Sequence, residues 1–151
     1  MSDFLQTMAQ SSAVRAAQAP SFVDADFDKP VVPLTLGAFD LIAEIKQRSP
    51  AEGELQQSGT GHPISDRAQA YAAGGAAAIS VLTEPSRFDG ELAHLEEVVA
   101  AVPDTPVMRK DFLVEPVQVL EARKAGASGV LLITTMLNDA KLGAMLDCAF
   151  E

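Results

Sequence analysis

The sequence predicts an α/β fold with a parallel sheet, and three observations support this fold class. Four short apolar segments alternate with four longer segments that have the character of helices. Each short segment is almost continuously apolar, which is typical of strands that helices bury on both faces. The hydrophobic content of 48% is enough to build such a core.

A helix and a connector precede this alternation. Residues 2–18 carry apolar side chains at helical spacing, and Ser2 or Asp3 suits the N-cap position. Three prolines in residues 19–38 disfavour both helix and central strand, so this stretch is predicted to be a connector. The predicted units are an N-terminal helix with its proline-containing connector, residues 1–38, and a partial (β/α) barrel of four units, residues 39–151.

The alternating elements follow in order, and glycine and proline mark several of their ends. The expected strands are residues 39–45, 76–82, 106–110 and 129–133, and the expected helices are residues 65–73, 91–101, 116–125 and 138–149. Gly74, Gly75 and Gly126 stand where helix C-caps belong. Pro116 suits a first helical turn, and Asn138 or Asp139 could cap the last helix. The pattern therefore predicts βαβ crossovers.

Composition and charge narrow the function classes. The net charge of −10 and the pI of about 4.5 disfavour nucleic-acid binding, because such a chain repels phosphate backbones. No apolar run is long enough to span a bilayer, and the start lacks a secretory signal pattern. The lone Cys148 cannot form an internal disulfide, which fits a reducing compartment. We expect a cytoplasmic protein without a membrane partner.

Polar residues gather at the ends of the expected strands, where parallel α/β folds place their chemistry. Glu44 and Lys46 alternate with Ile45, so both should point to one face of the sheet. The alternative explanation of these two residues is a structural ion pair at a strand end, which the spacing favours less. Lys110 ends the third strand, and its spacing alone leaves it either solvated at the rim or directed at a ligand.

These segments resemble a known family. Residues 41–50 (LIAEIKQRSP) resemble the first-strand signature of indole-3-glycerol-phosphate synthases. Residues 76–84 (AAAISVLTE), followed by FDG at 88–90, are similar to the family's second strand and its loop, and residues 106–112 (PVMRKDF) match its third-strand motif. The resemblance covers most of residues 39–145, in the family's order and spacing.

The resemblance implies a TIM (β/α)8 barrel with an extra N-terminal helix, of which this chain holds about the first four β/α units. It implies a carboxy-lyase of tryptophan biosynthesis. The implied reaction closes the ring of 1-(2-carboxyphenylamino)-1-deoxyribulose 5-phosphate and decarboxylates it, giving indole-3-glycerol phosphate, carbon dioxide and water. No cofactor or metal is implied, and the implied partner is this small anionic phosphorylated substrate.

The resemblance also implies roles for single residues. Lys110 matches the family's general acid, Lys46 matches the lysine that contacts the anionic substrate, and Glu44 matches the glutamate paired with it. The implied substrate-binding residues that line the pocket are Ser49, Phe88 and Phe112. These types suit the chemistry, because a developing alkoxide needs a proton donor, a phosphate needs cations and an anilino ring needs apolar walls.

Two stretches depart from the family pattern. Residues 51–53 read Ala-Glu-Gly where the family has a small residue, a basic residue and glycine, so Glu52 replaces a positive charge. The glycine-rich residues 58–63 are expected to form a loop, and not a phosphate loop, because they do not open a helix directly after a strand. His62 and His94 lack ligand-like spacing and are expected at the surface.

The chain ends at Glu151, after the fourth expected helix. In the family the general-base glutamate, an asparagine and the phosphate-binding loops lie on later strands. We therefore expect a synthase fragment that lacks full catalysis by itself. The alternative is a non-catalytic half-barrel that binds a phosphorylated ligand or self-associates through open sheet edges. A related barrel such as phosphoribosylanthranilate isomerase also shares this architecture, but the Glu44, Lys46 and Lys110 motifs argue against it.

Overall fold

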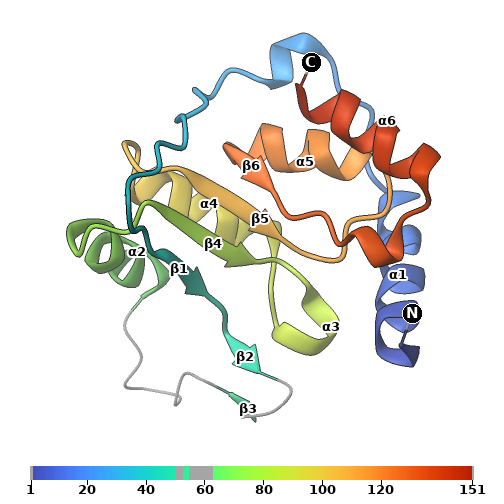
Figure 1. Ribbon diagram of the computed structural model, residues 1–151, viewed down its shortest axis with the longest axis horizontal. Coiled ribbons are helices and arrows are strands. Elements are labelled where there is room, and N and C mark those ends of the chain that lie inside the picture. Colours follow the sequence, from blue (N-terminus) through green and yellow to red (C-terminus); the bar gives the residue numbers. More distant parts are fainter. Residues whose placement is uncertain (1, 50–52, 55–62, 151) are drawn as a thin grey trace.

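A computed structural model describes residues 2–49, 53–54 and 63–150 (Figure 1). The helices are α1 Asp3–Ala16, α2 Ile64–Ala73, α3 Pro85–Phe88, α4 Leu92–Ala101, α5 Val117–Ala125 and α6 Asp139–Phe150, with short 3-10 turns η1 Asp24–Asp26 and η2 Thr134–Met136. The strands are β1 Ile42–Ile45, β2 Arg48–Ser49, β3 Gly53–Glu54, β4 Ala78–Leu82, β5 Val107–Lys110 and β6 Gly129–Val130.

The main sheet is parallel and follows the chain, in the order β1-β4-β5-β6. Ile45 lies opposite Val81, and Leu82 lies opposite Lys110. Because every neighbouring pair is parallel, the carboxyl ends of all four strands lie at one edge of the sheet. The predicted α/β fold with a parallel sheet is confirmed, and it amounts to a partial barrel.

Helices cover one face of this sheet. Figure 1 shows α2, α4 and α5 on the same side of the strands, and each contacts at least one strand. The core between the helices and the sheet is apolar and contains Ile45, Ile64, Ala68, Ile79, Val81, Leu95, Val98, Val102, Val107, Ala122, Ala125 and Ala127. Because side chains alternate along a strand, the other face carries Glu44, Ser80 and Met108, which share one register row.

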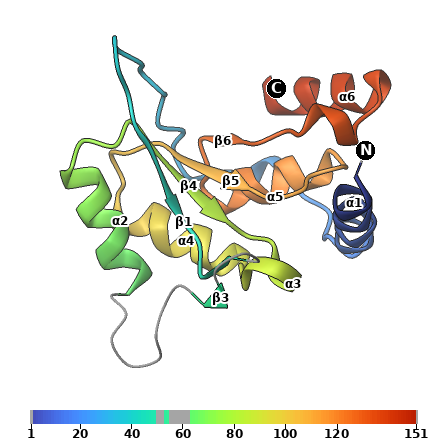
Figure 2. The same ribbon diagram turned by 60° about the horizontal axis from the view of Figure 1, so that its bottom comes forward.

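The N-terminal helix lies at the far end of the sheet from α2, as both ribbon views show (Figure 2). The Ser2 side chain accepts a hydrogen bond from the Leu5 backbone at 3.4 Å, so the predicted cap is confirmed. The connector is fastened to α5, since Lys29 Nζ donates to the Ala125 carbonyl at 3.2 Å. Gly126 caps α5 with φ of 97°, the left-handed conformation expected of glycine there.

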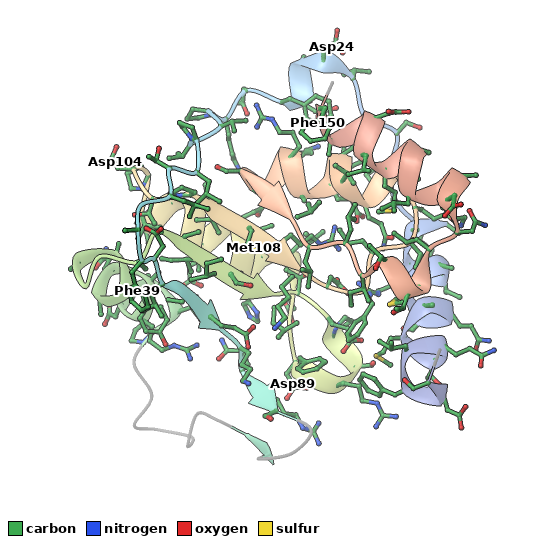
Figure 3. The ribbon with its side chains drawn as sticks, viewed as in Figure 1. Asp24, Phe39, Asp89, Asp104, Met108 and Phe150 are labelled. Atoms are coloured by element: carbon green, nitrogen blue, oxygen red, sulfur yellow. The ribbon has the colours of Figure 1, made fainter. Side chains whose placement is uncertain are left out.

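Some element boundaries were predicted wrongly. The first strand begins at Ile42 and not at Phe39, whose side chain is 91% exposed and has no core to pack against (Figure 3). The fourth strand ends at Val130 and not at Ile133, because its pairing with β5 stops where Val130 lies opposite Arg109. Both strands lie at edges of the described sheet, where one side supplies no ladder to extend them.

Several short elements had not been expected, among them α3 and the β2–β3 pair. Helix α3 starts because Glu84 accepts hydrogen bonds from the backbones of Ser86 at 2.9 Å and Arg87 at 2.7 Å, while Pro85 occupies its first turn. The antiparallel pair β2–β3 joins Ser49 to Gly53. The glycine-rich stretch 58–63 falls mostly outside the described residues. Within the described part of the chain, no helix is long and apolar enough to cross a membrane.

Candidate active site

Two of the expected site residues lie at the carboxyl end of β1. Glu44 lies on β1 and Lys46 follows it, while Ile45 between them is buried in the core on the helix-covered face. Lys46 Nζ lies 3.6 Å from Glu44 Oε1. Both side chains are about one-third exposed, at 32% for Lys46 and 29% for Glu44, so a solute can reach them.

The third expected residue reaches the same carboxylate from another strand. Lys110 ends β5, and its Nζ forms an ion pair with Glu44 Oε2. Because β4 lies between β1 and β5, this ion pair crosses β4 on the face of the sheet opposite the core helices. One carboxylate therefore contacts two ammonium groups, which come from the carboxyl ends of two different strands. Such a pair of cations is suited to an anionic ligand that competes with Glu44.

Aromatic side chains, two of them from the segments that follow β4 and β5, form a row. The rings of Phe88 and Phe112 lie 6.2 Å apart, centroid to centroid, and Phe4 meets Phe112 edge-on at 5.8 Å. The structure thus brings together the two phenylalanines that the resemblance indicated. It adds Phe4 from α1, whose part in this row sequence reasoning missed. In the sequence, the one sign that Phe4 would be packed was its place on the apolar face of the predicted helix. Such a row offers an apolar wall to an aromatic ligand.

Ser49 lies on β2 and is buried, with 7% of its surface exposed. Its neighbour Arg48 pairs with Asp89 at 3.8 Å, which ties β2 to the end of α3 (Figure 3). Asp89 adopts a left-handed conformation with φ of 52°. Residues 50–52, including Glu52, lie outside the described residues, so the effect of the missing positive charge there stays a prediction.

The histidines stand apart from the cluster. His94 lies on α4 and is half-buried, so the expectation of a surface histidine was only partly right. Helix α4 contacts α2, β4 and β5, so parts of its surface are covered. His62 lies outside the described residues.

A buried polar network lies on the opposite, helix-covered side of the β5 end, and sequence reasoning missed it. Arg109 and Asp111 flank Lys110 and are 2% and 1% exposed. Arg109 donates to the Gln118 carbonyl at 2.9 Å and to Glu121 at 3.0 Å. Arg15 donates to both carboxylate oxygens of Asp111 at 2.8 Å, from helix α1. The network fastens this segment to helices α1 and α5.

Asp111 stays charged in this setting. Burial by itself would raise the pKa of its carboxyl, but the hydrogen bonds and charge of Arg15, with the charge of Arg109, outweigh that effect and hold the pKa below its ordinary value. Burial likewise tends to lower the pKa of Arg15, and the contacts with Asp111 raise it overall. The signal in the sequence was the run of three charged residues, Arg109-Lys110-Asp111, which indicated a charged strand end but not its partners.

The fold and this cluster define the first half of a parallel (β/α) barrel with a cationic site at the carboxyl ends of its strands. The family model for indole-3-glycerol phosphate synthase matches residues 6–151. The chain belongs to the indole-3-glycerol phosphate synthase family.

Individual relatives agree with this assignment. The indole-3-glycerol phosphate synthase of Nocardioides sp. is 51% identical over 130 residues, which cover 84% of this chain and 48% of the relative. The synthase of Leifsonia xyli subsp. xyli is 45% identical over 142 residues, covering 92% and 50%. That of Opitutus terrae is 41% identical over 146 residues, covering 94% and 51%. The chain spans about half the length of the curated relatives it matches.

Proposed function

We propose that this chain provides the first four β/α units of an indole-3-glycerol-phosphate synthase. The reaction closes the ring of 1-(2-carboxyphenylamino)-1-deoxyribulose 5-phosphate with loss of carbon dioxide and water. The observation that carries the proposal is the shared carboxylate, since Glu44 binds both Lys46 and Lys110 at the carboxyl edge of the sheet. As in the sequence-based expectation, the reaction needs no cofactor and takes place in the cytoplasm.

Each of the three residues has a distinct task in this proposal. Lys110 is the general acid that protonates the substrate's ketone oxygen as the ring carbon attacks it. Lys46 binds the substrate's anionic groups, for which an ammonium is suited. Glu44 holds both ammonium groups in place until the substrate arrives. Removing Glu44 should therefore impair both substrate binding and proton transfer.

The remaining residues supply the pocket. Phe88 and Phe112 provide an apolar wall for the anilino ring, and the 6.2 Å spacing of their rings supports a shared surface. Ser49, on β2, is proposed to line the pocket as well.

A chimera tests the proposal, because the chain covers only 48% of its Nocardioides relative. Residues 1–151 would be joined to the remaining C-terminal part of that relative, and indole-3-glycerol phosphate would be followed by its fluorescence. We expect turnover from the chimera and none from the 151-residue chain alone. A chimera that unfolds cooperatively, binds the substrate and makes no product would contradict the proposal, as would robust turnover by the chain alone.

A second candidate function is association without turnover. Among the described residues, β1 and β6 each pair on one side only, and the side chains of Leu41 and Ile42 at the β1 edge are 59% and 51% exposed. Open edges with apolar side chains favour pairing with another chain. Sedimentation equilibrium of the 151-residue chain, with and without the substrate, distinguishes a self-associating half-barrel from a monomer.

A further inference from the structure

Thr83 makes three contacts with one short segment of the neighbouring strand. Its backbone N–H donates to the Lys110 carbonyl at 3.0 Å. Its hydroxyl donates to Asp111 Oδ2 at 2.8 Å and accepts a hydrogen bond from Arg109 Nε at 3.0 Å. Thr83 thus touches three consecutive residues, with Lys110 in the middle. The residue is 3% exposed, so water does not compete for these bonds.

The position of Thr83 decides what these contacts do. Thr83 directly follows β4, the strand over which the ion pair between Lys110 and Glu44 passes. The backbone of Arg109 and Lys110 pairs with the neighbouring strands. The other described side-chain bonds from Arg109 and Asp111 to separate elements run to helices α1 and α5, through Arg15 and Gln118. The hydroxyl of Thr83 therefore adds a side-chain link between the end of β4 and the two residues that flank Lys110, beyond the backbone pairing of the strands.

We propose that Thr83 is a positioning residue whose hydroxyl, by bridging Arg109 and Asp111, holds the Lys110 ammonium against Glu44. The inference rests on the proposed function only for the chemical task of Lys110. Thr83 itself lies on the helix-covered side of the sheet with Arg109 and Asp111, so it acts through the backbone between them. A hydroxyl is required because one atom must both donate and accept, and a methyl group can do neither.

The test compares Thr83→Val, which keeps the shape and removes the hydroxyl, with Thr83→Ser, which keeps the hydroxyl. Lysines of the 151-residue chain would be dimethylated with ¹³C-formaldehyde and observed by NMR. The Lys110 signal is assigned by its loss in Lys110→Arg, and Glu44→Gln gives its position when the ion pair is absent. We expect Thr83→Val to shift the Lys110 signal most of the way toward that position, and Thr83→Ser to restore it.

Matched controls separate positioning from a general loss of structure. Thr105→Val makes the same change just before β5, at the opposite end of that strand, and should leave the Lys110 signal unchanged. The signal of Lys124, which pairs with Asp26 at 3.0 Å, should stay constant in every variant. If Thr83→Val does not fold, Thr83→Ala also removes the hydroxyl and leaves the other bonds of Arg109 and Asp111 in place, and the same shift is expected.

The readout does not require turnover, so a failure of the proposed synthase reaction and a failure of this inference are distinguishable. A Lys110 signal that keeps its wild-type position in whichever of these variants folds would overturn the positioning role. A shift in Thr83→Ser as large as that in Thr83→Val would overturn it too, because the hydroxyl would then be irrelevant.

Discussion

Arg15 donates two hydrogen bonds, both 2.8 Å long, to the two carboxylate oxygens of Asp111. The pair joins the N-terminal helix to the residue after β5, across 96 positions of sequence. Asp111 has no exposed side-chain surface, whereas Arg15 keeps 26% of its side chain exposed. A bidentate arginine–carboxylate pair of this kind is directional as well as charged. The pair therefore links α1 to a buried charge that directly follows Lys110.

Replacing Arg15 with alanine should lower the free energy of unfolding by about 3 kcal/mol, the low end for removing one partner of a buried ion pair. The low end applies because Asp111 keeps its contacts with Arg109 and Thr83. Arg15→Lys should recover part of the loss, since it restores the charge without the planar fork. Urea unfolding followed by circular dichroism measures both changes.

The control for this prediction is Arg87→Ala on α3, whose side chain is exposed. It should change the free energy of unfolding by less than about 0.5 kcal/mol, as surface substitutions usually do. If Arg15→Ala proves as stable as Arg87→Ala, the ion pair with Asp111 does not hold α1 in place.

The charge of Asp111 also predicts a dependence of stability on pH. Its pKa in the folded chain lies below the ordinary value of 3.8, so the folded state favours the carboxylate. This contribution is complete above about pH 5 and is lost as the pH falls through the ordinary value toward the lower folded value. The difference in free energy of unfolding between the wild-type chain and Asp111→Asn should therefore shrink steadily as the pH is lowered from about 5 to about 3.

Comparing the two proteins cancels the other carboxylates, which titrate alike in both. A difference that stays constant over this range would mean that Asp111 does not gain its charge preference on folding. Urea unfolding at several pH values, at constant ionic strength, gives the measurement.

Gly90 is predicted to tolerate no side chain. A Cβ at this position would lie 2.4 Å from the Leu82 carbonyl oxygen and 2.8 Å from the Glu84 nitrogen, both of them backbone atoms that cannot rotate away. Gly90→Ala should therefore cost at least about 2 kcal/mol of unfolding free energy, in the range of overpacked substitutions. Thermal unfolding checks this value, and a Gly90→Ala chain as stable as the wild type would contradict the close approach.

Gly143 provides the matched comparison. It lies within α6, and a Cβ there would meet no atom within 4 Å. Gly143→Ala should raise the free energy of unfolding by about 0.5–1 kcal/mol, because alanine favours helix and has fewer unfolded conformations.

The sequence was sufficient for the sheet and its main cluster because both depend on local patterns. Alternation along β1 places Glu44 and Lys46 on one face, and the parallel order brings Lys110 to the same edge. The strand ends were less predictable, since Phe39 is apolar yet lies where no partner packs on it. Apolar character alone did not show where pairing stops.

The buried network could not be predicted for a different reason. Arg15 lies in helix α1 and Asp111 directly follows strand β5. Charged residues at such positions are usually exposed, so nothing in the sequence indicated that these two would be buried together. Only the packing of α1 against the β5 end makes them partners. A contact between residues so far apart in sequence leaves no periodic signal, so a single sequence does not reveal it.

The roles of the two lysines give the last prediction. In the chimera of residues 1–151 with the C-terminal part of the Nocardioides relative, Lys110→Ala should reduce turnover by at least about 10²-fold, the usual scale for a lost general acid. Lys46→Ala should chiefly raise KM, because its proposed task is to bind the substrate's anionic groups. The matched control is Lys141→Ala, which removes a lysine that pairs with Glu115 outside the candidate site. Steady-state kinetics with the phosphorylated substrate measures all three, and near-normal turnover in Lys110→Ala would remove this residue from proton transfer.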